Sequence, residues 1–178
     1  MNSEAKALNR IRDLIPLMVA FFRDPVSVIK EPVRLSWPAA FALQFVFAMI
    51  SGSVNALINQ SVVDFIVSLV VFPIAVAMIG AVFTLFLYYF FSVTQHTYLD
   101  IRRLHSLSVL ATVPYFIVHA IASFLPPLDL IGFALTCILL TVGLSEQFGL
   151  ARRPVMILTG VLYAIFFVAW SAIQVAIT

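Results

Sequence analysis

The chain has 178 residues, of which 63% are hydrophobic and only 10% are Asp, Glu, Lys or Arg, with a mean hydropathy of +1.11. A soluble domain carries about 25% charged residues, so this composition excludes an ordinary water-exposed surface and predicts an integral membrane protein. The net charge of +2 is too small to indicate a nucleic-acid partner. The single cysteine, Cys137, excludes a disulfide framework and a cysteine-based metal site.

Residues 1–35 are predicted to form a cytoplasmic or interfacial segment ahead of the membrane domain. Apolar residues recur there at steps of three and four, which is typical of an amphipathic helix lying on a membrane surface. They are Leu8, Ile11, Leu14, Ile15, Met18 and Phe22. A short second helix is expected after Asp24, because aspartate is a good N-cap and Pro25 suits a first helical turn.

Five apolar stretches are long enough to cross a hydrocarbon core, which takes about 20 helical residues. They cover about residues 36–57, 65–91, 106–125, 127–145 and 154–177. Continuous apolar runs disfavour a membrane β-barrel, whose strands alternate in polarity. The predicted fold class is therefore all-α, a polytopic membrane bundle of five transmembrane helices over residues 36–178.

The ten Lys and Arg residues predict which side of the membrane each loop occupies. Six lie in residues 1–35, two lie between the second and third spans, and two lie between the fourth and fifth. Five crossings bring all ten to one side, and basic loops are typical of the cytoplasmic side. The N-terminus is therefore expected in the cytoplasm and the C-terminus outside.

Residues 96–106, HTYLDIRRLHS, gather charge in a chain where charge is scarce. Their place between two spans predicts a cytoplasmic loop, with its arginines as orientation signals. Two interpretations stay open, a solvated turn or a docking surface for a cytosolic protein partner. The candidate docking residues are His96, Asp100, Arg102, Arg103 and His105. Two histidines and one aspartate, without a further close ligand, are weak evidence for a metal site.

The third span carries a polar stripe along one predicted helical face. Its residues follow steps of four, three, four and four: Ser108, Thr112, Tyr115, His119 and Ser123. One interpretation is a groove for a lipid head group or small solute. The other is a packing seam whose groups hydrogen-bond across helices. His119 is expected in the outer half of the membrane, near Asp129 or near Asn55 and Asn59.

No catalytic or cofactor-binding motif is found in the sequence. A glycine-rich phosphate loop, HExxH, GxSxG and paired catalytic carboxylates are all missing. No charged residue falls in the middle of a predicted span, which argues against ion-coupled transport because such pathways normally retain a buried charge. The chain is therefore predicted to be non-enzymatic, without a cofactor.

Three sequence features resemble the Yip1 family of five-span membrane proteins in its shorter bacterial form. They are a segment with a proline after an acid, FFRDPVSVIKEP (residues 21–32); a span with a proline before an aromatic, SVLATVPYFIVHAI (residues 108–121); and a span–loop–span pattern, LPPLDLIGFALTCILLTVGLSEQFGLARRPVMIL (residues 125–158). The resemblance implies five spans and a cytoplasmic N-terminus. The DLYGP-type motif of eukaryotic relatives associated with Rab GTPases is missing, so Rab binding is not implied.

Two functions are compatible with these features. The first is a membrane scaffold or adaptor that recruits a protein partner at its cytoplasmic face or organises membrane lipid. The alternative is a small transporter or lipid-handling protein that uses the polar stripe as a groove. The compact loops and the missing eukaryotic motif favour the bacterial cytoplasmic membrane. A homo-oligomer is expected, because a small bundle exposes much apolar surface to its neighbours.

Overall fold

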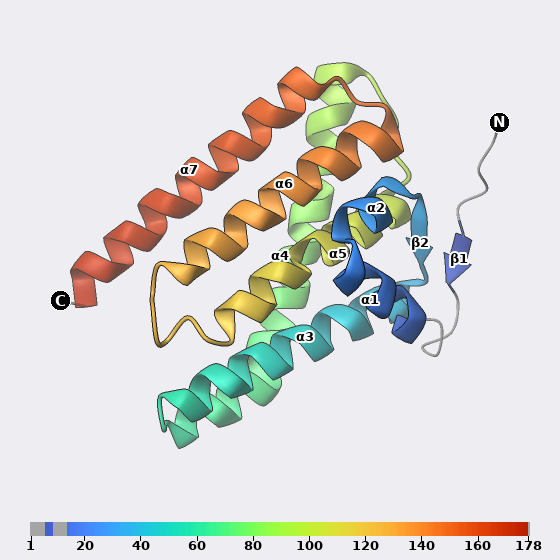
Figure 1. The fold of residues 1–178 in the computed structure, drawn as a ribbon. Helices are drawn as coiled ribbons and strands as arrows, with labels where there is room; N and C mark the ends of the chain where they lie inside the picture. Colours follow the sequence, from blue (N-terminus) through green and yellow to red (C-terminus); the bar gives the residue numbers. More distant parts are fainter. Residues whose placement is uncertain (1–5, 9–13, 178) are drawn as a thin grey trace.

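The computed structural model describes residues 6–8 and 14–177 and is built almost entirely of helices (Figure 1). The elements in chain order are β1 (Lys6–Leu8), α1 (Leu14–Arg23), α2 (Pro25–Lys30), β2 (Val33–Leu35), α3 (Trp37–Ile58), α4 (Val62–Gln95), α5 (Ile101–His119), α6 (Leu128–Phe148) and α7 (Arg152–Ile177). The short strands β1 and β2 pair in parallel. Of the predicted amphipathic run, Leu8 belongs to β1 and Ile11 lies outside the described residues.

Four of the described helices are long and apolar enough to cross a membrane, namely α3, α4, α6 and α7. The predicted class of an all-helical, multi-pass membrane protein is therefore confirmed at this level. The helix α5 takes the place of the third predicted span, but it is less apolar than the other four long helices. The lower hydropathy of α5 is explained by the other elements of the protein, which pack around it.

Local capping determines where the long helices begin and end. The side chains of Ser36, Ser61 and Asp100 each accept a hydrogen bond from a backbone N–H in the first turn of α3, α4 and α5. At the other ends, His96 (φ 49°) after α4 and Gly149 (φ 64°) after α6 adopt the left-handed conformation that terminates helices. These caps are local signals, and each acts on its own helix.

Two predicted spans differ from the helices that the structure contains. With 34 residues, α4 is about 50 Å long at full helical rise, and it extends beyond residues 65–91 at both ends. The third predicted span, residues 106–125, corresponds to a helix over Ile101–His119. That helix starts early because Asp100 caps it, and after its last residue the chain continues in tight turns towards α6.

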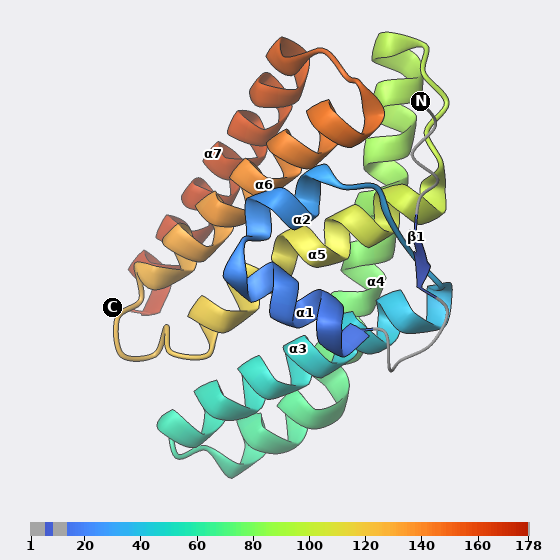
Figure 2. The ribbon, with the colours of Figure 1, turned by 45° about the vertical axis from the view of Figure 1, so that its right-hand side comes forward.

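Protein surrounds α5 on several sides (Figures 1 and 2). It packs against α3, α4, α6, α2 and β2. Leu104, Leu107 and Leu110 are fully buried, as are most residues in the first three turns. A helix enclosed in this way presents little surface to its environment, so it can be less apolar than a peripheral helix such as α4.

The hairpin of α1 and α2 packs on the outside of the long helices, with α2 against α6 and α5 (Figure 2). Phe21 and Ile29 are buried in the same apolar core as residues of α3, α5 and α6. At the end of α2, Gln147 Nε2 donates a hydrogen bond to Ile29 O (2.7 Å). Residues 14–35 therefore share one core with the helices of residues 36–178, although the two parts were predicted as separate segments.

Glycines allow α6 to approach its neighbours closely. A Cβ on Gly132 would lie 3.1 Å from the backbone Cα of Tyr115 on α5. A Cβ on Gly143 would collide with the Leu107 side chain and lie 3.0 Å from Cγ2 of Ile29. Close backbone contact through small residues is a general packing mode of membrane helices, and here it joins α6 to both α5 and α2.

We expect Gly132→Val to destabilise the protein by about 1–3 kcal/mol, because the new side chain must displace the α5 backbone. The matched control is Gly160→Val on α7, where a Cβ meets nothing within 4 Å. Both changes place valine inside a helix, so the intrinsic helix propensity changes equally. Thermal unfolding in detergent measures both variants, and equal melting temperatures would contradict the close approach of α5 and α6.

Candidate functional site

A hydrogen-bond network joins three helices where α3 and α5 finish and α4 and α6 begin. We call this the acidic end of the bundle, because it carries Asp64 and Asp129. His119 Nδ1 on α5 lies 2.8 Å from Asp129 Oδ1 on α6. Asn55 Nδ2 on α3 donates to His119 O (2.9 Å), and Asn59 Nδ2 donates to Asn55 Oδ1 (3.1 Å). The predicted neighbours of His119 are thereby confirmed.

A cavity of about 200 Å³ lies beside this network, between α3, α4 and α5. It is lined by polar and apolar residues together: Gly52, Asn55, Ala56, Asp64, Val67, Ser68, Phe72 and His119. The His119 ring stacks on Phe72 and on Tyr115, with centroids 5.9 and 5.5 Å away. Two ring contacts and the carboxylate at Nδ1 thus fix the orientation of the imidazole at the wall of the cavity.

The inner part of the predicted polar stripe is satisfied within its own helix. Ser108 Oγ donates to Leu104 O (3.0 Å), and Thr112 Oγ1 donates to Val109 O (2.9 Å). Ser123 lies in the turns after α5 and not on the helix. These bonds are intrahelical, so the inner part of the stripe supports neither a groove nor a seam of hydrogen bonds across helices. Only its outer part, around His119, borders the cavity.

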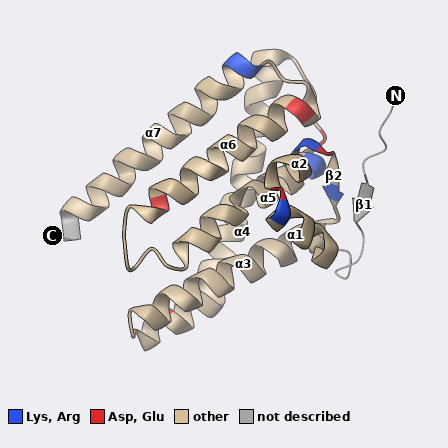
Figure 3. Cartoon of the chain, viewed as in Figure 1, with Lys and Arg blue, Asp and Glu red and all other residues tan. Residues whose placement is uncertain are grey.

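The opposite end of the bundle holds the Lys and Arg residues of the described chain (Figure 3). We call it the basic end. The prediction of one loop over residues 96–106 is wrong for residues 101–106, which form the first turns of α5. Arg102 Nε donates to Leu35 O (2.9 Å). Arg103 Nε donates to Gln147 Oε1 (3.3 Å). These contacts tie the arginines to β2 and α6 and fix their positions.

His105 is buried in the bundle, with 1% of its surface exposed, so it is not available for docking. Its Nδ1 lies 3.0 Å from Thr84 Oγ1 on α4. Because Thr84 donates its one hydroxyl proton to Gly80 O (2.8 Å), Nδ1 of His105 is the donor between the two side chains. The rings of Trp37 and Phe41 lie against the imidazole, with centroids 5.2 and 5.0 Å away. Sequence reasoning missed these partners, since no local pattern links them.

The linker between α4 and α5 is the exposed part of the predicted docking region. Tyr98 is 86% exposed, and His96 and Asp100 are exposed beside it. Leu99 is buried and anchors the linker to the core. Asp100 Oδ2 forms an ion pair with Arg34 (3.4 Å) in addition to capping α5. The linker is therefore held at its end while its polar and aromatic side chains face outward.

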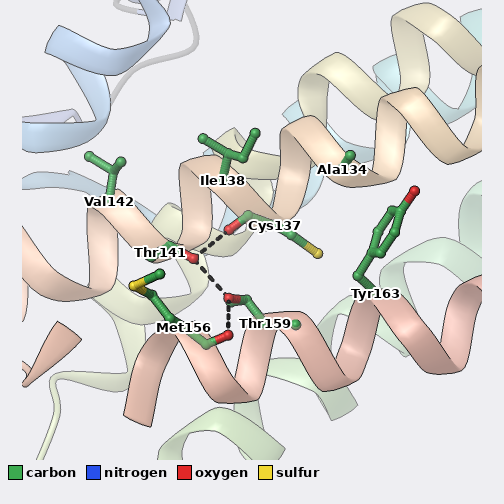
Figure 4. Close-up of a pocket in the computed structure, with 9 residues that line it drawn as sticks. Ala134, Cys137, Ile138, Thr141, Val142, Met156, Thr159 and Tyr163 are labelled. Atoms are coloured by element: carbon green, nitrogen blue, oxygen red, sulfur yellow. Dashed lines mark hydrogen bonds between the residues drawn. The ribbon is translucent and has the colours of Figure 1, made fainter. Parts of the chain in front are cut away.

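A groove of about 400 Å³ between α6 and α7 was not predicted from the sequence (Figure 4). Its walls are mainly apolar, and Tyr163, Met156 and Cys137 contribute to them. The hydroxyls of Thr141 and Thr159 lie 2.8 Å apart across the two helices. Each hydroxyl has one proton, so one donates to the other across the helices while the second donates to a backbone carbonyl of its own helix, and the pair links α6 to α7.

No group of three His, Cys, Asp or Glu side chains in the described part of the chain is placed to hold a metal ion. No family model, curated protein or solved structure matches the chain. The resemblance to the Yip1 family therefore stays a prediction, and the geometry alone supports the functional conclusions below.

We expect Asn55→Ala to lower the free energy of unfolding by about 1 kcal/mol, because it removes an interhelical hydrogen bond of the size found in membrane proteins. Asn59→Ala removes only the exposed bond to Asn55 and should cost about 0.5 kcal/mol or less. Chemical unfolding in mixed micelles measures the difference. Equal losses for the two variants would show that the contact with His119 O adds nothing to stability.

Proposed function

We propose that the chain crosses the membrane five times, with its basic end in the cytoplasm and its acidic end outside. With five crossings, every Lys and Arg of the sequence falls on the same side of the membrane. This is the distribution expected for cytoplasmic loops. The 19 residues of α5 span about 28 Å, close to the thickness of a hydrocarbon core. Because protein surrounds it, α5 can serve as the fifth crossing despite its lower hydropathy.

In this arrangement α1 acts as an interfacial helix of the cytoplasmic leaflet. Its inward face is anchored by buried Leu14 and Phe21. Its outward face exposes Ile15, Val19 and Phe22, which follow steps of four and three. The helix is therefore apolar on both faces, and the apolar outward face is accounted for if it contacts lipid. Membrane lipid is thus the first partner of this segment.

The function that the geometry supports best is a non-enzymatic membrane scaffold that recruits a protein partner at the basic end. The observation that carries this proposal is the exposure of Tyr98 on an anchored linker. Exposed aromatic side chains in fixed positions are frequent energetic centres of protein interfaces, and loops on rigid frames commonly carry binding residues. Because basic side chains outnumber acidic ones at this end, the expected partner is acidic.

A Yip1-type protein of the bacterial cytoplasmic membrane fits this scaffold role, and family membership is part of the proposal. Self-association is also part of it, since α4 and α7 expose long apolar faces. The alternative of a lipid-handling protein is favoured by one observation, the cavity beside His119 at the acidic end. The satisfied hydroxyls of Ser108 and Thr112 confine that alternative to the outer part of the stripe.

We expect a photo-reactive phenylalanine analogue at Tyr98 to form a discrete protein adduct in native membranes, because the linker contacts the partner. The same analogue at Ile66, an exposed residue of α4, should yield lipid adducts only. Charge reversal at exposed Arg153, by Arg153→Glu, should reduce the protein adduct several-fold if the partner is acidic. The scaffold function fails if Tyr98 gives no protein adduct, or if Ile66 gives the same one.

A further inference from the structure

The cavity at the acidic end is lined by acceptors that have no partner among the described residues. Ser68 is only 8% exposed, and its hydroxyl bonds to no described group. Its Oγ faces the space beside Gly52, since a Cβ placed on that glycine would lie 3.0 Å away. His119 Nδ1 lies 2.8 Å from Asp129 Oδ1, and in the tautomer that carries its proton on Nδ1 the other ring nitrogen, Nε2, is an acceptor. Asp64 also lines the cavity; it is exposed, and its carboxylate forms no ion pair with a described residue.

The electrostatic field at this end favours a cation. The C-terminal turns of α3 and α5 meet here, and each carries partial negative charge on its last carbonyl groups. Asp64 adds a full negative charge and offsets the positive end of α4. No Lys or Arg occurs in residues 35–101 or 104–151, so no basic side chain of these segments can neutralise the site.

The remaining walls of the cavity suit a small organic cation more than a bare metal ion. The Phe72 ring offers an aromatic face that attracts ammonium groups. Val67 and Ala56 provide apolar contacts for a short carbon stem. A volume of about 200 Å³ is several times the roughly 30 Å³ that a water molecule occupies in the liquid, so an ammonium group with two or three carbons fits.

We propose that this cavity binds a primary ammonium group, such as the ethanolamine head group of a phospholipid or a free small amine. The three N–H donors of such a group match three acceptors: Ser68 Oγ, His119 Nε2 and the Asp64 carboxylate. A trimethylated ammonium group has the same charge but no N–H, so it makes none of these bonds. The proposal concerns the acidic end and does not depend on the docking function at the basic end.

The test uses the full chain in nanodiscs that contain equal amounts of phosphatidylethanolamine and phosphatidylcholine with identical acyl chains. After release from the nanodiscs, native mass spectrometry measures which lipid stays bound. We expect at least about tenfold enrichment of phosphatidylethanolamine, because methylation removes all three hydrogen bonds and the loss of even one charge-assisted bond corresponds to about a factor of ten. Displacement of the bound lipid by free ethanolamine identifies a general amine site; enrichment without displacement identifies the phospholipid as the ligand.

Two variants locate the site and two matched controls guard against general effects. Asp64→Asn and Ser68→Ala remove a charge and a hydroxyl from the cavity, and both should bring the enrichment close to one. Glu146→Gln neutralises an acid at the basic end, and Ser53→Ala removes a buried hydroxyl that does not line the cavity. Both controls should keep the enrichment. Equal retention of the two lipids by the unmodified chain, or enrichment that survives both cavity variants, would overturn the proposal.

Discussion

The enclosure of α5 by protein is the constraint on which the rest of the structure depends. This helix is the least apolar of the long helices, and it carries His105 near one end and His119 at the other. Side chains from α3, α4 and α6 supply partners to both histidines. The α1–α2 hairpin packs against α5 and α6, so the N-terminal segment helps to complete the enclosure. A bundle without this cover would leave polar groups facing hydrocarbon, which is costly.

The enclosed helix α5 runs between the two ends of the bundle and contributes residues to both. At the basic end, arginines are fixed by β2 and α6, and the linker before α5 exposes an aromatic side chain on an anchored backbone. At the acidic end, the C-termini of α3 and α5 converge on a small cavity with unpaired acceptors. The opposite charge of the two ends is the basis of the two proposals, an acidic protein partner at the basic end and an ammonium group at the acidic end.

Much of the helix order could be predicted from the sequence, because hydropathy alone reveals long apolar segments. The proximity of His119 to Asp129 and Asn55 was also predictable, since helices of similar length that alternate in direction bring their ends together. The limits of α5 were predicted less well, because the Asp100 cap outweighed the hydropathy boundary at residue 106. The burial of His105 against Thr84 and the packing of α1–α2 on the core depend on contacts between distant segments, which periodicity does not encode.

The crossing of the membrane by α5 is the central claim, and labelling of its two flanks tests it most directly. In a chain with Cys137→Ala, single cysteines replace Tyr98 before α5 and Phe124 after it, both strongly exposed. A membrane-impermeant maleimide is then applied to sealed vesicles of known orientation. We predict that Tyr98→Cys reacts only from the cytoplasmic side and Phe124→Cys only from the other side. Reaction of both cysteines from the same side would contradict the crossing of α5 and the five-span arrangement with it.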